Sequence, residues 1–180
     1  GIIGQITIQI LKASGCKVIA IDIDETRLNL AKTLGADCIL NPDTDNDNAS
    51  TKLITDNYGV DAVIVTASSP SDLIIASAFN MCRKKGKIIL VGDVGLNLNR
   101  ADFYVKELDF LISSSYGPGR YDNKYEDDNI DYPLPFVRWT ENRNMAEFLR
   151  LVSQKAINIG LLISDIYKIA GMYKTAKFLD

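Results

Sequence analysis

Gly1-Ile2-Ile3-Gly4 opens the chain, and Val18-Ile19-Ala20-Ile21-Asp22 follows it after a segment with apolar residues at helical spacing. A glycine turn, a helix, a buried strand and an acidic residue in this order are typical of a dinucleotide-binding unit. The glycines let backbone amides approach a pyrophosphate, and the helix directs its positive end at that charge. The acid accepts hydrogen bonds from ribose hydroxyls. We therefore predict that a dinucleotide binds at Gly1, Ile2, Ile3, Gly4 and Asp22.

Each part of this motif has a competing interpretation. Gly1 and Gly4 form only the second half of G-x-G-x-x-G, and two glycines at this spacing are more often a plain turn. Asp22 could be an acidic strand end that caps the next turn, although Asp24 already fills that role. The order of the elements and a separation of about 20 residues favour the ribose interpretation.

The rest of the chain alternates between strand and helix patterns. Short apolar runs predict strands at 17–22, 38–40, 61–66, 87–91 and 110–115. Apolar spacing and capping residues predict helices at 3–14, 24–35, 49–57, 69–83 and 140–154. In the fourth of these helices we expect Ser69 to be the cap and the basic run 83–85 to complement the C-terminal dipole. This alternation predicts an α/β fold, a Rossmann-type doubly wound parallel sheet with helices on both faces.

Three further segments are candidates for the rest of the cofactor site. Ligands of such sheets bind beyond the carboxyl ends of the strands, where Thr66-Ala67-Ser68 and Val91-Gly92-Asp93 lie. Small residues there permit close approach of a cofactor, or they form simple turns. Arg27 could stack its guanidinium on the adenine, or it could be a solvated helix charge. The predicted contacts are therefore Arg27, Thr66, Ala67, Val91, Gly92 and Asp93.

Composition excludes several classes of protein. A formal net charge of -3 and a pI near 5.0, without a basic stripe, argue against a nucleic-acid binder. The chain has no histidine, and its cysteines Cys16, Cys38 and Cys82 are widely spaced, so the usual zinc patterns cannot be built. Reduced cysteines, together with the lack of a signal peptide or a long apolar run, predict a cytoplasmic protein that does not bind membranes.

At this level of detail the chain resembles the cofactor domain of the medium-chain dehydrogenases/reductases, the family of zinc alcohol, sorbitol and threonine dehydrogenases. The resemblance rests on the stretches Gly1-Ile2-Ile3-Gly4-Gln5, Val18-Ile19-Ala20-Ile21-Asp22, Arg27 with Leu28 and Ala31, Leu34-Gly35-Ala36-Asp37, Gly59-Val60-Asp61-Ala62-Val63 and Gly86-Lys87-Ile88-Ile89-Leu90-Val91-Gly92. It implies hydride transfer between NAD, or less favourably NADP, and an alcohol, polyol or sugar-type substrate. It also implies a homodimer formed through the edge strand at 110–115.

The later part of the chain is similar to a bacterial branch of that family, in which the dehydrogenase is joined to a sugar-oxidoreductase-like domain. The stretches that carry this similarity are Ser114-Ser115-Tyr116-Gly117-Pro118-Gly119-Arg120-Tyr121-Asp122, Asp131-Tyr132-Pro133 and Arg138-Trp139-Thr140-Glu141-Asn142-Arg143-Asn144-Met145. In such families zinc, where present, is held by a preceding barrel-like domain. The resemblance therefore assigns no catalytic or metal-binding residue to this chain, which we expect to be an inactive fragment when alone.

The resemblance and the patterns together give a domain division. Residues 1–159 form the NAD(P)-binding domain with an inserted loop at 117–139, and 160–180 is a tail that returns toward an absent catalytic domain, with a strand at 160–168 and a last helix toward Asp180. The first, central strand of the sheet is expected to be missing. The inner edges of the strands at 17–22 and 61–66 would then be left with unpaired buried backbone groups, so we expect either that the sequence is cropped or that another segment, such as one from a partner chain, fills the gap.

Two other functions remain open on the sequence alone. A methyltransferase that uses S-adenosylmethionine also joins a glycine loop to an acid after the second strand, but its sheet usually ends in an antiparallel hairpin. A non-catalytic dinucleotide-binding domain would show the same motif without any chemistry.

Overall fold

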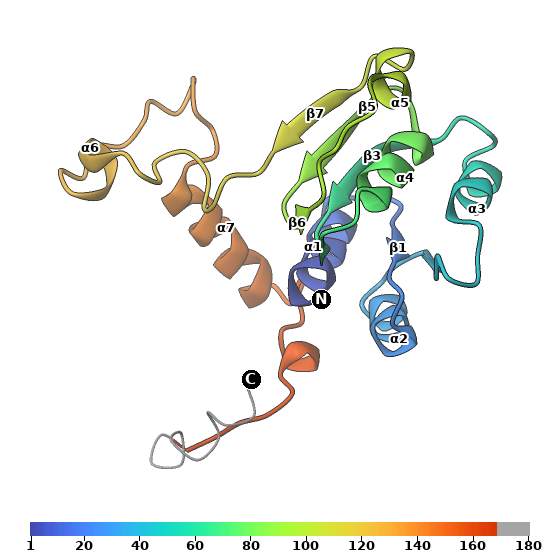
Figure 1. The fold of residues 1–180 in the computed structure, drawn as a ribbon. Helices are drawn as coiled ribbons and strands as arrows, with labels where there is room; N and C mark the ends of the chain where they lie inside the picture. The colour runs from blue at the N-terminus through green and yellow to red at the C-terminus, as the bar shows by residue number, and fades with distance from the viewer. Residues whose placement is uncertain (169–180) are drawn as a thin grey trace.

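A computed structural model describes residues 1–168 of the chain. Helices and parallel strands alternate along these residues, and the strands fall into two main sheets (Figure 1). The predicted α/β class with parallel strands is therefore confirmed. The helix predicted near Asp180 lies outside the described residues.

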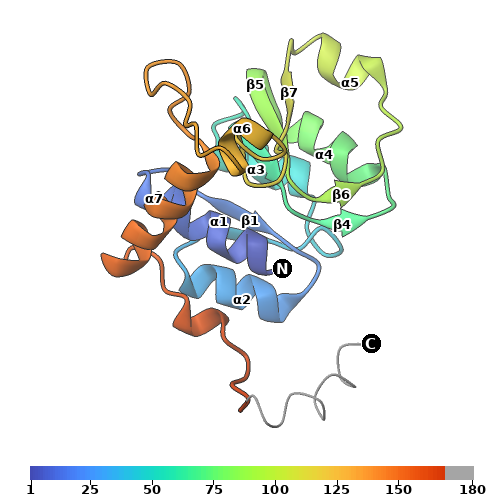
Figure 2. The same ribbon diagram turned by 90° about the vertical axis from the view of Figure 1, so that its left-hand side faces the viewer.

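The first sheet belongs to the N-terminal part of the chain. Its elements are α1 (Ile2–Ala13), β1 (Ile19–Ile21), α2 (Glu25–Thr33) and β2 (Cys38–Leu40), whereas the following α3 (Asp47–Ile54) packs on α4 (Leu73–Met81). Strands β1 and β2 pair in parallel, and α1 and α2 lie side by side against them (Figure 2). Both helices and both strands lie close to the predicted ranges, and a capping side chain sets the start of α2.

Asp24 shows how such a boundary is set. Its carboxylate accepts hydrogen bonds from the backbone nitrogens of Thr26 and Arg27, as predicted for the cap of α2. Gly35, with φ of 106°, follows the helix in a conformation that favours glycine. The small core beneath these helices consists of Ile8, Val18, Ala31 and Ala36.

The second sheet has three parallel strands in the order β3 (Val60–Val65), β5 (Cys82–Leu90) and β7 (Asp109–Ile112). Helices α4 (Leu73–Met81) and α5 (Arg100–Tyr104) pack on it, and a short parallel ladder of β4 (Ser68–Ser69) with β6 (Asp93–Val94) extends beyond its carboxyl edge. Its core is larger and consists of Val65, Ile75, Ala78, Phe79, Cys82, Ile88, Leu90 and Val94.

Strands β1 and β3 are not paired with each other in the described chain. The sequence prediction placed them on either side of a central strand, and a direct pairing would have contradicted that order. The observed arrangement therefore agrees with the predicted strand order, and it keeps the ends of β1 and β3 in different sheets.

The fourth predicted helix differs from the structure at both ends. Ser69 belongs to β4, and α4 begins only at Leu73 after Asp72. The basic run Arg83 to Lys85 lies inside β5, at a register shift where Lys85 has φ of 60°. The C-terminal end was mispredicted because a distant residue, and not the basic run, satisfies it. Lys106 Nζ donates to the carbonyl oxygens of Phe79, Asn80 and Cys82 at the end of α4.

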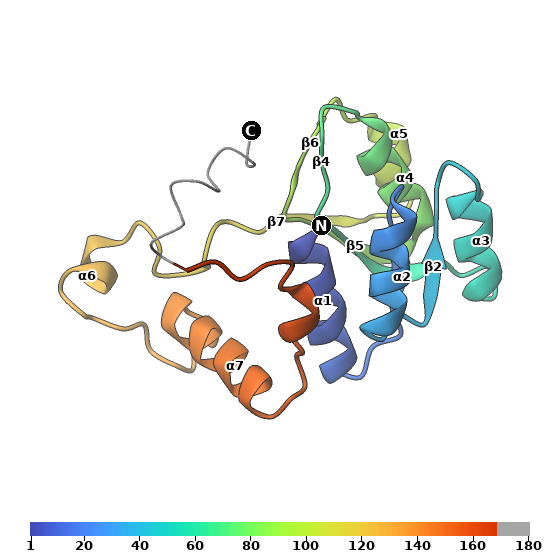
Figure 3. The same cartoon turned by 90° about the horizontal axis from the view of Figure 1, so that it is seen from below.

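The C-terminal part contains α6 (Asn123–Glu126) and α7 (Glu141–Ser153), which confirms the helix predicted at 140–154. The strand predicted at 160–168 is wrong, since a single 3-10 turn, Gly160–Leu162, is followed by irregular backbone. Ile157 is buried, and Asn158 is tied to α1: its backbone nitrogen donates to Gln9 Oε1 at 2.6 Å. This tether leads the segment along α1 rather than to a sheet edge (Figure 3).

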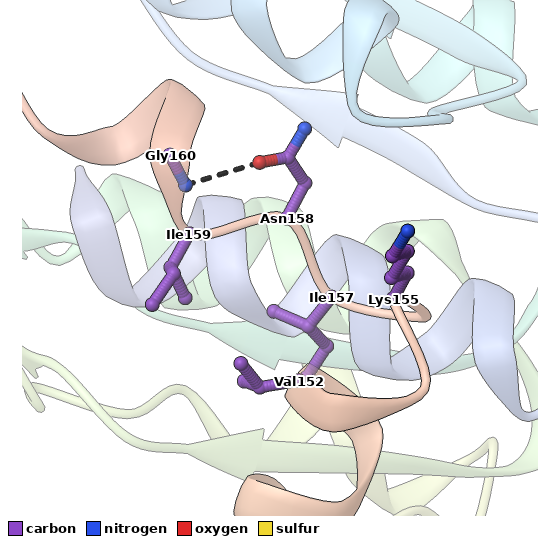
Figure 4. Close-up of a pocket in the computed structure, with 6 residues that line it drawn as sticks. All are labelled: Val152, Lys155, Ile157, Asn158, Ile159 and Gly160. Atoms are coloured by element: carbon purple, nitrogen blue, oxygen red, sulfur yellow. Dashed lines mark hydrogen bonds between the residues drawn. The ribbon is translucent and has the colours of Figure 1, made fainter.

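The end of α7 and the residues that follow it line an open hollow of about 310 Å³. The lining residues are Val152, Lys155, Ile157, Asn158, Ile159 and Gly160 (Figure 4). Asn158 Oδ1 accepts a hydrogen bond from Gly160 N, so this amide oxygen shapes the turn itself. None of the predicted site residues lines the hollow. Separately, no helix among residues 1–168 has the length and apolar character needed to cross a membrane.

Candidate cofactor site

The glycine turn stands at the beginning of α1, with Gly1 as the N-cap. The first intrahelical hydrogen bond runs from Gln5 N to Gly1 O, which leaves the preceding amides free to bind an anion. A Cβ atom on Gly4 would lie 3.0 Å from Thr66 Oγ1. This close contact brings the start of α1 against the end of β3, as the prediction for Gly4 and Thr66 requires. Ile2 and Ile3 are exposed at the same turn.

Asp22 lies directly after β1, and its backbone nitrogen donates to Leu40 O at 3.3 Å. One carboxylate oxygen accepts a hydrogen bond from Asp24 N at 3.1 Å, and the other lies 3.6 Å from Gly1 N. The side chain is 23% exposed. Asp22 therefore supports the next turn, as the competing interpretation held, and also faces the glycine turn, as the ribose interpretation requires.

Arg27 lies in the first turn of α2 with about half of its side chain exposed. Its Nη1 is 3.9 Å from Asp22 Oδ1, and its Nε is 3.5 Å from Asp24 Oδ2. Hydrogen bonds from the backbone nitrogens of Arg27 and Thr26 lower the pKa of Asp24, with the Arg27 charge adding to the effect. The guanidinium thus lies close to the carboxylates of both Asp22 and Asp24.

The carboxyl ends of β3 and β5 touch each other through small residues. Gly92 N donates to Val65 O at 2.8 Å, and Asp93 N donates to Ala67 O at 3.1 Å. A Cβ atom on Gly92 would lie only 2.0 Å from Ala67 O, so no other residue fits there without moving the backbone. The close packing of the two turns therefore requires glycine at position 92. The predicted residues Val91 and Asp93 flank it at the same edge.

Gln5 was missed as a site residue, although it belongs to the quoted glycine motif. Its side chain is 6% exposed, and Nε2 donates to Arg27 O at 2.8 Å, which fixes α2 to α1. Its Oε1 is buried without a hydrogen-bond partner in the described chain. A buried amide oxygen without a donor costs about 1–3 kcal/mol, so the position calls for a ligand or water donor. Only the tertiary arrangement reveals it, because glutamine in a helix carries no local signal.

The described residues do not offer a zinc site. Among residues 1–168 no group of three or more Cys, Asp or Glu side chains is arranged so that it could hold a metal ion. Cys16 is exposed, Cys38 is half-buried and Cys82 is buried, and all three are free thiols. Burial raises the pKa of the Cys82 thiol. These cysteines therefore do not provide the clustered thiolates that zinc requires.

Known proteins with similar sequences are dehydrogenases. The family model of zinc-binding dehydrogenases matches residues 3–128. An alcohol dehydrogenase of Geobacillus stearothermophilus is 38% identical over 92 residues, which are 51% of this chain and 26% of that protein. An NAD-dependent alcohol dehydrogenase of Saccharolobus solfataricus is 35% identical over 100 residues, 55% of this chain and 28% of that protein. The matched region thus spans about a quarter of these relatives.

Solved structures show the same fold. Benzyl alcohol dehydrogenase from Acinetobacter calcoaceticus superimposes with a TM-score of 0.73 at 24% identity, over 98% of this chain and 43% of that one. The alcohol dehydrogenase of Aeropyrum pernix gives 0.69 at 21% identity, over 98% and 43%. Nothing in these comparisons supports the methyltransferase alternative. Since the family model covers well over half of the sequence, the chain belongs to the zinc-binding dehydrogenase family.

Proposed function

We propose that this chain binds the nicotinamide dinucleotide of an oxidoreductase that transfers a hydride between NAD and the carbinol carbon of an alcohol. The observation that carries the proposal is the meeting of the glycine turn, Asp22 and the end of β3 at one point of the fold. Relatives named NAD-dependent alcohol dehydrogenases support it. Because the match spans about a quarter of those relatives, the activity of the whole protein belongs to the proposal.

The residues at this edge suit the dinucleotide in four ways. Amides of the turn 1–4 would hold the pyrophosphate at the positive end of α1, and Asp22 would accept hydrogen bonds from the ribose hydroxyls. Arg27 would flank the adenine. Thr66, Ala67, Val91, Gly92 and Asp93 would line the nicotinamide half of the site. When bound, the nicotinamide supplies the hydride chemistry, and the chain's own residues bind and orient it.

The domain division is proposed with the function. Residues 1–159 form the cofactor-binding domain with the loop 117–139, and the segment from 160 onward leads toward another part of the whole protein. Zinc, if the whole enzyme uses it, would be held by that other part. The substrate is an alcohol, polyol or sugar-type molecule, and a cytoplasmic location remains a prediction.

The test is a binding titration of the whole polypeptide with NADH, NADPH and S-adenosylmethionine. Binding is detected by the change in fluorescence or by the heat released. We expect NADH to bind, NADPH to bind more weakly because Asp22 repels its 2′-phosphate, and S-adenosylmethionine not to bind. Binding of S-adenosylmethionine without NADH would overturn the proposed function. A protein that binds NADH yet oxidises no alcohol would point to the non-catalytic alternative.

We further propose that the whole protein is a homodimer formed through the outer edge of β7. This strand pairs only with β5 in the described chain, and Leu111 and Ile112 are exposed on it. An apolar strand with a free edge invites pairing with a second copy. Light scattering of the complete protein should give the mass of a dimer, and a monomer alone would contradict this.

A further inference from the structure

Gln5 joins the two helices that begin at the predicted cofactor contacts. It lies one turn after the glycine N-cap of α1, and its backbone nitrogen donates to Gly1 O at 3.1 Å. Its buried side chain reaches α2, which runs beside α1 (Figure 2), where Nε2 donates to Arg27 O at 2.8 Å. Within residues 1–168 this is the only hydrogen bond of the Gln5 side chain. The amide therefore connects the glycine turn directly to the first turn of α2.

The contact with α2 continues to the predicted ribose ligand. Arg27 N donates to Asp24 Oδ1 at 3.2 Å, and Asp24 N donates to Asp22 Oδ1 at 3.1 Å. The other oxygen of Asp22 lies 3.6 Å from Gly1 N. These contacts form a closed circuit from Gly1 through Asp22, Asp24 and Arg27 to Gln5 and back to Gly1. Removal of one member leaves the Asp22 carboxylate less firmly placed relative to the glycine turn.

A second polar side chain attaches α1 to the same sheet, but at the other end of the helix. Lys12 Nζ donates to Asp37 Oδ2 at 2.8 Å. Lys12 follows Gln5 by two helical turns, so the two side chains lie on one face of α1 and about 10 Å apart along its axis. Only the contact of Gln5 is close to the glycine turn. Lys12 therefore provides a matched control for the effect of position.

We infer that Gln5 is a positioning residue for the adenosine half of the cofactor. Its amide holds the first turn of α2, and through that turn the Asp22 carboxylate, at a fixed place relative to the glycine turn. The inference rests on the proposed function and adds to it a buried residue that does not itself touch the cofactor. Without this hydrogen bond the cofactor would have to order the first turn of α2 itself, so its affinity would fall by up to the contribution of the bond.

The experiment measures the affinity of the whole polypeptide for NADH, NADPH and adenosine 5′-monophosphate, which carries only the adenosine half. Gln5→Met keeps the length of the side chain but has no donor, and Gln5→Leu is a second variant of the same kind. Lys12→Met is the matched control, because it removes the other polar contact of α1. Urea unfolding of each variant is measured in parallel.

We expect Gln5→Met and Gln5→Leu to weaken the binding of NADH and of adenosine 5′-monophosphate by the same factor, about two- to tenfold. The preference for NADH over NADPH should shrink as well, because Asp22 is held less firmly. The midpoint of unfolding should change little, since the substitution also removes the buried Oε1, which has no donor among residues 1–168. Lys12→Met should leave all affinities unchanged.

Unchanged affinities in both Gln5 variants would refute the inference. A loss for NADH without a loss for adenosine 5′-monophosphate would contradict it too, because the effect would then lie in the nicotinamide half. An equal loss in Lys12→Met, or a loss that merely follows a lower midpoint of unfolding, would show that Gln5 acts only in packing. Failure of the unaltered protein to bind NADH at all would refute the proposed function, which is a separate outcome.

Discussion

The two sheets are stabilised by cores of different kinds. Beneath α4 the core is large and aromatic: Ile88 is fully buried, and Phe79 packs on Phe103 and Phe110 at ring-centre distances of 5.4 and 5.7 Å. Beneath α1 and α2 it is small and contains Ala31 and Ala36. Small residues let α1, which begins at the glycine turn, and α2 pack closely on β1, which leads to Asp22. The difference indicates that the second sheet provides most of the stability, whereas the first provides most of the predicted cofactor contacts.

The same substitution in the two cores tests this comparison most strongly. Ile88→Ala should lower the free energy of unfolding by about 4 kcal/mol, and Ile8→Ala by about 2 kcal/mol, because a cavity deep in a large core relaxes least. Urea denaturation of the whole polypeptide, followed by circular dichroism, measures both values. Equal losses would mean that the two cores contribute alike.

Lys106 tests whether a single side chain secures the end of α4 in the larger core. Lys106→Met keeps the apolar stem but leaves the carbonyls of Phe79, Asn80 and Cys82 without this donor, so we expect a loss of about 1–3 kcal/mol. Lys84→Met, in the exposed part of β5, is the control and should change stability little. The account of the α4 terminus would be wrong if both variants unfolded at the same urea concentration.

Asp37, an exposed residue beside the smaller core, provides a pH test of the first sheet. Its carboxylate accepts hydrogen bonds from Lys12 Nζ and from Val18 N, and these bonds lower its pKa in the folded state. The stabilisation is therefore present above the unfolded-state pKa and is lost as the pH falls through the folded-state value. The stability difference between the unaltered protein and Asp37→Asn should shrink on acidification below about pH 4. A difference that is constant down to pH 2 would exclude this linkage.

Local sequence signals predicted the elements that local interactions determine. Asp24 caps α2 because its own side chain reaches the next amides, and Cys38–Leu40 forms a strand over the three predicted residues. The apolar spacing of α7 likewise needed no tertiary information.

The errors have a common physical origin in contacts between distant residues. The end of α4 depends on Lys106, and the path after Ile157 depends on Gln9, so neither could be read from neighbouring residues. The orphaned oxygen of Gln5 likewise arises only when α1 and α2 meet, because Gln5 Nε2 donates to Arg27 O. The proximity of Gly4 to Thr66 and of Gly1 to Asp22 could be predicted because the order of a glycine turn, a helix and a strand fixes their positions. Their contact with a cofactor stays a prediction.

The most direct test of the central claim compares NADH and NADPH binding in the unaltered protein and in Asp22→Asn. Asp24→Asn is the matched control, because Asp24 lies two residues away and caps α2 without facing the glycine turn. The account predicts that NADH binds about tenfold or more tightly than NADPH, that Asp22→Asn reduces this ratio by removing the repulsive charge, and that Asp24→Asn leaves it unchanged. An unchanged ratio in Asp22→Asn would contradict the placement of the ribose at Asp22, and with it the proposed cofactor site.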